Sequence, residues 1–319
     1  MAKLLFSLLL LADAFAWLSI SDYHSSFDGY PDVFLIGAAK AGTTSIAYFL
    51  VDALRLYVES GGRKEPIFFS YFNDKCFNEY IAGFNEEKKR YGNLPTLDGS
   101  VAYFAREDVW IKMKRLYSPD CLRKKKFILS LREPIARDVS WFNHYYGNCL
   151  RNAPGEYCPH PGGPDFHDTF HDCVVRLDLN PIRHGFYLRN LKRILKVISR
   201  DQLFILSFES LISEDRQDTI ERLLRFLEIN STVASGALFP KTNSAEHRCQ
   251  GFCEKTKTNE FFCSDFRYLN QTYSEVNAGL VEFINSDPNR PPFEPVFRPF
   301  AERLSVKCRE ADGSLVDFN

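Results

Sequence analysis

Short apolar runs alternate along this chain with segments in which apolar residues recur at helical spacing. Three runs have the length and composition of buried strands: residues 33–36, 127–131 and 203–208. Four segments show helical periodicity or a helix start signal: residues 43–54, 135–146, 184–198 and 216–229. Strands that alternate with helices predict a parallel sheet covered on both faces. We therefore expect an α/β fold, with a single domain built on a central parallel sheet flanked by helices.

The first 16 residues have the pattern of a leader segment. Lys3 precedes an apolar run over residues 4–12, and Ala14-Phe15-Ala16 offers a small-residue cleavage site. A membrane-spanning helix would place Asp13 near its centre at a cost of about 2.5–3.5 kcal/mol. The pattern favours a cleaved signal peptide and leaves an uncleaved type II anchor as the alternative. Either one predicts the secretory pathway, in the Golgi lumen or outside the cell, with membrane association only through this segment.

Cysteines and glycosylation sequons agree with that route. Two groups of three cysteines flank or occupy loop-like stretches: Cys149, Cys158 and Cys173, and Cys249, Cys253 and Cys263. In an oxidising compartment such groups predict disulfides that pin loop insertions. Asn230 and Asn270 each begin an N-x-[ST] sequon.

Composition narrows the class of partner. The chain has 319 residues, a net charge of -1 and 45% hydrophobic residues, so it can bury a sizeable core. This balance argues against a nucleic-acid binder that depends on bulk positive charge. His167 and His171 are spaced like a pair of metal ligands, but no C-x-x-C pair accompanies them. Disulfides and the start of a helix account for the same residues. We therefore predict no metal site.

The stretch PDVFLIGAAKAGTTSIAYFL, residues 31–50, predicts a strand, a glycine-containing loop and a helix start. Backbone N–H groups and the helix dipole make such a junction an anion site. A nucleotide-binding P-loop places its lysine directly after the second glycine, whereas here Lys40 precedes Gly42. The loop is therefore P-loop-like, with an ammonium group that projects from inside it.

A second anion receptor is predicted after the strand at 127–131, which leads into Arg132. A nucleotide hydrolase needs an acidic magnesium ligand at such a strand end. An arginine there favours a second anionic group over a metal.

These motifs resemble those of sulfotransferases that use 3′-phosphoadenosine 5′-phosphosulfate (PAPS), over about residues 31–265. AAKAGTTS is similar to the family's 5′-phosphosulfate loop, and LREPIARDVSWFNHY is similar to its 3′-phosphate element. The later half of the chain resembles the Golgi carbohydrate branch. The resemblance implies PAPS as co-substrate and these donor-binding residues: Lys40, Ala41, Gly42, Thr43, Thr44, Ser45, Arg132 and Ser140.

The base is implied by a further resemblance. GRKEPIFFSYF, residues 62–72, is similar to the K-E-x-x-F-F element of heparan sulfate sulfotransferases. It implies that Glu65 is the general base and that Lys64 lies near the sulfuryl group or the acceptor, so both contact substrate. Lys40 would stabilise the leaving group. The alternative is a surface Lys-Glu pair before a strand that starts at Phe68-Phe69.

Two elements depart from the family's pattern. LDGSVAYF, residues 97–104, has Gly99 where the family's K-[ST]-x-x-Y segment has a lysine that helps to position substrate. CEKTKTN, residues 253–259, keeps Lys255 and Lys257 but lacks the glycine and arginine of the late K-x-K-G-R donor loop. Lys257 is still expected to contact the donor, with a solvated lysine as the alternative.

The sequence thus predicts a leader at 1–16, a sulfotransferase domain at 31–287 and an extended tail at 288–319. We expect an enzyme that transfers a sulfuryl group to a hydroxyl or amine of a glycan or similar acceptor. Two alternatives stay open: a kinase or hydrolase with a variant phosphate loop, and a non-catalytic secreted protein of the same fold.

Overall fold

The computed structural model describes residues 31–54, 56, 58, 62, 64–70, 74–92, 95–150, 169–176, 184–213, 216–229, 261–298, 300 and 307–318. The leader at 1–16, the sequon at Asn230 and the cysteines 158, 249 and 253 lie outside these residues.

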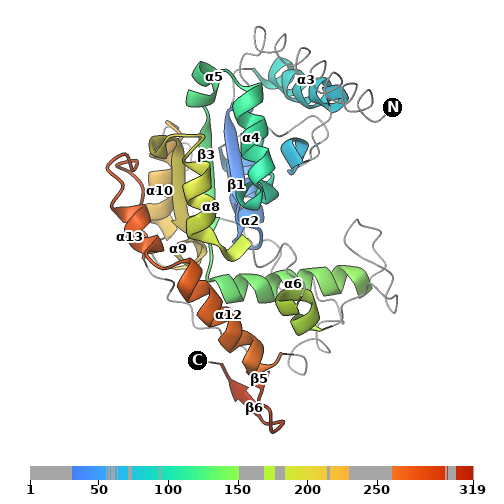
Figure 1. The fold of residues 1–319 in the computed structure, drawn as a ribbon. Helices are drawn as coiled ribbons and strands as arrows, with labels where there is room; N and C mark the ends of the chain where they lie inside the picture. Colours follow the sequence, from blue (N-terminus) through green and yellow to red (C-terminus); the bar gives the residue numbers. More distant parts are fainter. Residues whose placement is uncertain are drawn as a thin grey trace, which may run out of the picture.

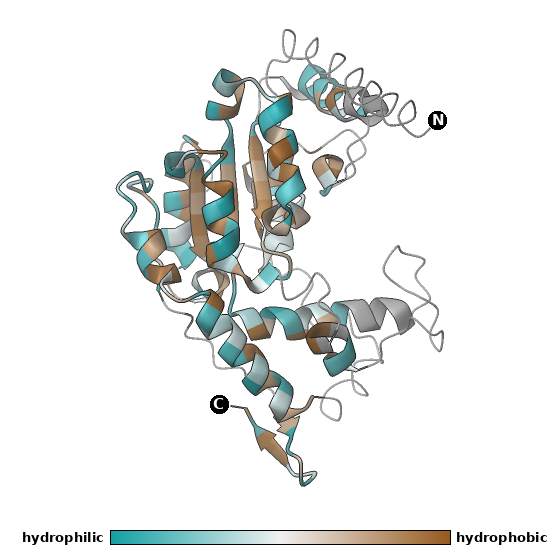
Figure 2. Ribbon diagram, viewed as in Figure 1, coloured by the Kyte–Doolittle hydropathy of each residue, from teal (hydrophilic) through white to brown (hydrophobic). Residues whose placement is uncertain are grey.

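Four parallel strands form the central sheet in the described part of the chain, in the order β2-β1-β3-β4. They are β1 (Val33–Gly37), β2 (Leu97–Asp98), β3 (Lys126–Leu131) and β4 (Leu203–Ser207). Phe34 pairs with Phe127, and Ile128 with Phe204, so the three longer strands are in register at the centre. Nearly every residue of these strands is buried, as the continuous apolar runs predict (Figure 2).

One face of the sheet packs against α4 and α8, which lie in front of it in Figure 1. The elements that contribute to this core are η3 (Phe68–Ser70), α3 (Asp74–Tyr91), η4 (Val101–Ala105), α4 (Glu107–Leu116), α5 (Pro119–Arg123), α8 (Tyr187–Ile194) and α13 (Leu280–Asn285). α4 shows why these residues form a helix, because Val109, Met113 and Leu116 recur on its buried face. Acidic residues in its first turn and basic ones in its last complement the helix dipole.

The other face packs against α2 (Thr43–Tyr48), its π-helical continuation η2 (Phe49–Ala53), α9 (Phe208–Ile212) and α10 (Arg216–Phe226). η6 (Arg200–Gln202) is a turn that leads into β4. The predicted helix over 43–54 is therefore present, but its second half is wound as a π-helix.

Beyond the carboxyl ends of the strands, α6 (Pro134–Leu150) and α12 (Cys263–Val276) extend away from the sheet (Figure 1). They pack with η5 (His171–Arg176) in a separate apolar cluster that includes Phe142, Phe170 and Phe266. Edge-to-face ring contacts at 5.5–5.6 Å between centroids join these three phenylalanines.

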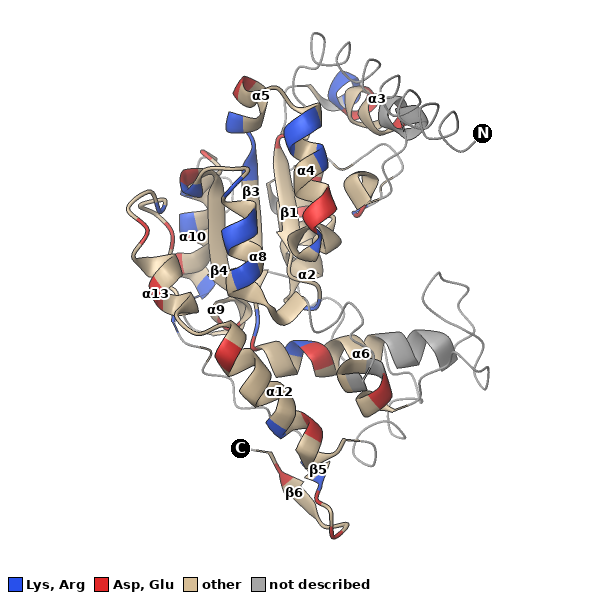
Figure 3. Ribbon diagram, viewed as in Figure 1, with Lys and Arg blue, Asp and Glu red and all other residues tan. Residues whose placement is uncertain are grey.

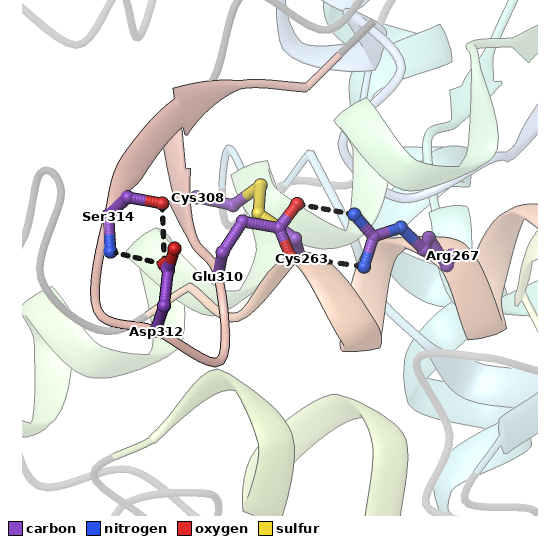
Figure 4. Close-up of a disulfide and its surroundings, with 6 residues drawn as sticks. All are labelled: Cys263, Arg267, Cys308, Glu310, Asp312 and Ser314. Atoms are coloured by element: carbon purple, nitrogen blue, oxygen red, sulfur yellow. Dashed lines mark hydrogen bonds and ion pairs between the residues drawn. A yellow bond between two sulfur atoms is a disulfide. The ribbon is translucent and has the colours of Figure 1, made fainter.

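The predicted tail contains an element that the sequence analysis does not predict. β5 (Lys307–Arg309) and β6 (Leu315–Asp317) form an antiparallel hairpin. Cys308 in this hairpin forms a disulfide with Cys263 at the start of α12, and Arg267 pairs with Glu310 beside it (Figure 4). Cys263 thus pairs with the tail and not with Cys249 or Cys253 of its own predicted group. The physical reason is that a partner 45 residues away in sequence is brought close by folding.

The α/β prediction is confirmed: a central parallel sheet is flanked by helices, and a disulfide is present. One local prediction differs from the structure, and so does one detail of the alternative given for the Lys64-Glu65 pair. Phe68 and Phe69 are buried in the 3₁₀ turn η3 and not in a strand. α8 is shorter than the predicted 184–198, because residues 195–197 form turns. No helix within the described ranges is long and apolar enough to cross a membrane.

Candidate functional site

The loop at residues 38–42 joins β1 to α2 and is fastened to β3 through Ser130. The Ala38 N–H donates to the Ser130 carbonyl at 2.6 Å, and the Ser130 hydroxyl donates to the Ala41 carbonyl at 2.6 Å. Ser130 is fully buried, so water does not compete for these bonds. The ends of the loop are therefore held rigidly against the carboxyl end of the sheet.

Two residues of this loop have left-handed backbone conformations. Lys40 has φ of 70° and Gly42 has φ of 74°. A Cβ atom at Gly42 would lie 2.7 Å from Cδ2 of Phe208, so glycine is required both by the backbone angle and by this close approach. A non-glycine residue at positive φ costs conformational energy and is found preferentially at functional sites. Lys40 adopts this unfavourable conformation, which indicates a functional role for the residue.

The predicted donor-binding residues after Lys40 differ in how accessible they are. Ala41 is buried, and its N–H donates to the Ala38 carbonyl at 3.1 Å, which leaves its amide engaged within the loop. Thr43 is also buried, whereas Thr44 and Ser45 are partly exposed at the start of α2. The two partly exposed hydroxyls are the ones placed to reach a ligand.

Arg132 emerges from the end of β3 beside this loop, as predicted. Its Nη1 lies 3.4 Å from the Lys40 carbonyl oxygen, and its guanidinium carbon lies 4.5 Å from the centroid of the Phe208 ring. The Tyr187 hydroxyl donates to the Arg132 carbonyl at 2.6 Å. The Arg132 backbone is thus held by Tyr187 of α8, and its side chain packs on Phe208 of α9. The structure brings Lys40 and Arg132 together on adjacent strand ends.

The start of α6 is capped by its own chain. Glu133 accepts hydrogen bonds from the N–H groups of Ile135 at 3.0 Å and Ala136 at 2.6 Å. Its own N–H donates to Glu209 at 3.1 Å. These carboxylates occupy the helix terminus that would otherwise attract an anion. Ser140 lies partly exposed further along α6, eight residues after Arg132.

The segment at residues 64–70 carries the predicted base. Glu65 forms an ion pair with its neighbour Lys64, with 2.6 Å between Nζ and Oε1, and both side chains are partly exposed. Three hydrogen bonds fasten the segment to residues 99–103. The Gly99 N–H donates to the Lys64 carbonyl at 2.9 Å. The Ile67 N–H donates to Ser100 Oγ at 2.9 Å, and the Phe69 N–H donates to Tyr103 Oη at 3.2 Å.

Gly99 explains one departure from the family's pattern. A Cβ atom at this position would lie 2.8 Å from the Lys64 carbonyl oxygen and 3.1 Å from Lys64 Cγ. The Lys64 side chain therefore covers the place where the side chain of residue 99 would begin. A lysine at 99 does not fit with this arrangement, and Lys64 supplies the ammonium group of this region.

A buried carboxylate supports the same segment from below. Asp98 accepts hydrogen bonds from Tyr80 Oη at 2.9 Å, Tyr103 Oη at 3.0 Å and Ser100 N at 2.9 Å. Burial raises the pKa of Asp98 to about 6, although these hydrogen bonds oppose the shift. Because Ser100 and Tyr103 also bind the segment at 64–70, Asp98 is the centre of the network that holds Glu65. Sequence reasoning missed this residue, and the only signal is an acidic residue inside an apolar strand end.

A second buried network is centred on α6, the helix that follows Arg132. Arg137 is fully buried and pairs with Asp138, which also accepts a hydrogen bond from Tyr273 of α12. Burial raises the pKa of Asp138 to about 6, against the effects of Arg137 and Tyr273. Burial also lowers the pKa of His184 to about 3, and the nearby Arg137 charge adds to this effect. This network joins α6 to α12 and contains no predicted site residue.

Lys257 and His167 lie outside the described residues. His171 contacts Asp265 of α12, with 2.7 Å between Nδ1 and Oδ1, so it links η5 to that helix. In the described ranges no group of three or more His, Cys, Asp or Glu side chains is placed to hold a metal ion.

Comparison with known proteins bears on the family and the fold of this chain. A family model described as "Sulfotransferase domain" matches residues 30–263. No curated protein matches the chain. The crystal structure of a sulfotransferase from Alicyclobacillus acidocaldarius is similar in fold, with a TM-score of 0.52 and 20% identity over 81% of this chain and 97% of that one. A sulfotransferase domain from the curacin biosynthetic pathway aligns with a TM-score of 0.39 and 11% identity, over 69% of this chain and 83% of that one.

Proposed function

Since this chain belongs to the sulfotransferase family, we propose that it transfers a sulfuryl group from PAPS to a hydroxyl or amine of a carbohydrate acceptor. The observation that carries the proposal is the approach of Arg132 to the loop of Lys40, with 3.4 Å between Nη1 and the Lys40 carbonyl. PAPS has two separated anionic groups, and a lysine loop beside an arginine offers one receptor for each. We call residues 38–42 the donor loop and residues 64–70 the acceptor segment.

The residues present suit such a donor. An ammonium, a guanidinium and two partly exposed hydroxyls are groups that bind phosphate and sulfate oxygens. We assign the 5′-phosphosulfate to Lys40, Thr44 and Ser45, and the 3′-phosphate to Arg132 and Ser140. When bound, PAPS supplies the sulfuryl group that is transferred. Phe208 keeps the Arg132 guanidinium plane in place by stacking.

The acceptor segment supplies the proton acceptor. An S–O or S–N bond forms to the acceptor atom, and the bond from sulfur to the bridging phosphate oxygen breaks. Glu65 takes the proton that the acceptor atom loses, and Lys40 faces the negative charge that grows on the departing phosphate. The Lys64 ammonium balances the charge of the Glu65 carboxylate at 2.6 Å, and we expect the acceptor to approach from the side of this pair.

We place this reaction in the secretory pathway. The leader pattern at 1–16 supports it, and so does the disulfide between Cys263 and Cys308, a bond that persists in oxidising compartments. Asn270 begins a sequon and is exposed on α12, where a glycan can be attached.

Incubating the purified chain with ³⁵S-labelled PAPS and a panel of polysaccharides tests the proposal. Label should pass to one or more carbohydrates without added nucleoside triphosphate. If instead the protein binds ATP with magnesium and ignores PAPS, the kinase or hydrolase alternative is correct. Binding of neither nucleotide would favour the non-catalytic alternative.

A further inference from the structure

A polar cavity of about 400 Å³ lies between the start of α4 and the first turns of α8. Its lining includes three arginines and two acidic residues: Arg106, Arg189, Arg193, Glu107 and Asp108. A volume of this order lies within the range of small-ligand sites. The lining carries a formal charge of +1 from three cations and two anions, in a chain whose net charge is -1.

The charges in this cavity are not fully matched. Arg106 holds Asp108 in a two-pronged contact, with 3.1 Å from Nε and 2.8 Å from Nη2. Arg193 reaches Glu107 at 3.4 Å across the gap between the helices, where basic bands on α8 face the acidic start of α4 in Figure 3. Arg189 is exposed, and no described residue forms a hydrogen bond or ion pair with it. Within the described part of the chain, Arg189 is therefore the cavity guanidinium that has no acidic partner.

The walls of the cavity continue into the elements of the proposed site. Arg106 directly follows η4, whose Tyr103 binds the acceptor segment at Phe69 N. On the other wall, Tyr187 at the start of α8 donates to the Arg132 carbonyl. The Phe104 and Tyr187 rings contact each other with 6.0 Å between centroids, which joins the two walls. The cavity thus adjoins the supports of both the donor loop and the acceptor segment.

We propose that this cavity binds an acidic group of the acceptor, a carboxylate or a sulfate ester, with Arg189 as its main contact. The inference rests on the proposed function and adds that the acceptor is an anionic carbohydrate. Arginine suits both groups because its planar fork donates two parallel hydrogen bonds to a carboxylate or sulfate. Arg193 lies one turn further along α8 and can share the ligand when it leaves Glu107, because their contact is long.

The matched control is Arg225, an exposed arginine on α10, which covers the opposite face of the sheet. The full-length chain and its Arg189→Ala, Arg189→Lys and Arg225→Ala variants are titrated with three disaccharides. One contains a uronic acid, one is its carboxyl-reduced counterpart, and one carries a sulfate ester in place of the carboxylate. Calorimetry measures affinity, so the assay does not depend on turnover.

Arg189→Ala should weaken binding of the acidic disaccharides about tenfold or more, since hydrogen bonds to charged groups are the stronger ones. Arg189→Lys should recover part of that loss, and Arg225→Ala should change nothing. The carboxyl-reduced disaccharide should bind weakly to every variant. A preference between the carboxylate and the sulfate ester identifies which acidic group the cavity takes.

Equal loss for acidic and carboxyl-reduced ligands, or no loss in Arg189→Ala, would overturn the inference. Binding of 3′-phosphoadenosine 5′-phosphate, measured in the same proteins, separates this failure from that of the proposed function. If all variants bind the nucleotide with equal affinity and the affinity for the acidic ligands does not depend on Arg189, the proposed donor site is retained and the proposed acidic subsite is rejected. If none of the proteins binds the nucleotide, the proposed function is rejected. The disaccharide titrations then still show whether the cavity binds an acidic group through Arg189.

Discussion

The donor loop and the acceptor segment reach the same end of the molecule, but different interactions hold them. The donor loop is fastened to the neighbouring strand β3 by two short bonds to Ser130, a residue that does not ionise. The acceptor segment is fastened to Gly99, Ser100 and Tyr103, which follow β2, and Ser100 and Tyr103 both bind the buried carboxylate of Asp98. The geometry of the donor loop itself should therefore be insensitive to pH, whereas the geometry around Glu65 depends on a titratable group.

The largest effect is expected from Lys40→Ala. Removing the ammonium that we propose faces the departing phosphate should lower kcat by about 10²- to 10³-fold, the usual cost of losing one such electrostatic contact. Sulfuryl transfer from labelled PAPS measures it. Lys124→Ala is the control, because Lys124 is an exposed lysine just before β3, at the opposite end of that strand. Undiminished transfer by Lys40→Ala would remove this lysine from the reaction.

Glu65→Gln should reduce kcat by about 10²-fold or more, the range for loss of a general base. Affinity for 3′-phosphoadenosine 5′-phosphate should stay the same, because Glu65 belongs to the acceptor segment and not to the donor loop. Steady-state kinetics and calorimetry provide the two numbers, with the exposed Glu282→Gln on α13 as the control. An equal loss of kcat and of nucleotide affinity would show that Glu65 has a structural role. The acceptor segment would then not differ in function from the donor loop.

The Asp98→Asn variant tests the titratable support. The pKa of Asp98 is raised by burial from 3.8 to about 6, so the native state keeps its proton over a range in which the unfolded chain has lost it. The free energy of unfolding therefore falls as pH rises between about 4 and 6. Wild type should lose about 2–3 kcal/mol more than Asp98→Asn between pH 4 and pH 7, as two pKa units imply.

Urea unfolding of both proteins at the two pH values gives this difference. Asp138 has the same raised pKa and is present in both proteins, so its contribution cancels. A constant difference between wild type and variant would show that Asp98 does not titrate in this window.

The smallest effect is expected from Gly99→Ala. The added Cβ would lie 2.8 Å from the Lys64 carbonyl, so the acceptor segment must shift slightly. We expect about a tenfold decrease in kcat, about 1.4 kcal/mol, with nucleotide affinity unchanged. Kinetics and calorimetry on the same preparation measure both. A variant with wild-type kcat would mean that the position of Lys64 and Glu65 tolerates this movement.

Local patterns were enough to predict the sheet and the placement of Lys40 and Arg132 at its edge. The three long strands are apolar runs, and Lys40 and Arg132 each follow one of them, so parallel pairing places them at one edge. This inference needs only strand ends and their order. It did not reveal Phe208, which lies after β4 and stacks on Arg132.

Contacts between distant segments explain what the sequence did not predict. The hydrogen bond from Tyr80 to Asp98 joins residues 18 apart, and the disulfide from Cys263 to Cys308 joins residues 45 apart. Neither pairing leaves a periodic or spacing signal in the chain. The fit of Gly99 against Lys64 likewise depends on packing. From sequence alone, Gly99 appears only as the loss of the family's lysine, whereas in the structure the absence of a side chain at 99 leaves space for Lys64.

The central claim is that Lys40 and Arg132 form two receptors for one donor. Calorimetric titration of wild type and Arg132→Ala with 3′-phosphoadenosine 5′-phosphate and with adenosine 5′-phosphate tests it most directly. Wild type should bind the first nucleotide at least about tenfold more tightly, since a charge-assisted contact contributes roughly 1.5–3 kcal/mol, and Arg132→Ala should lose most of this preference. Equal affinity of wild type for the two nucleotides, or an unchanged preference in Arg132→Ala, would contradict the account.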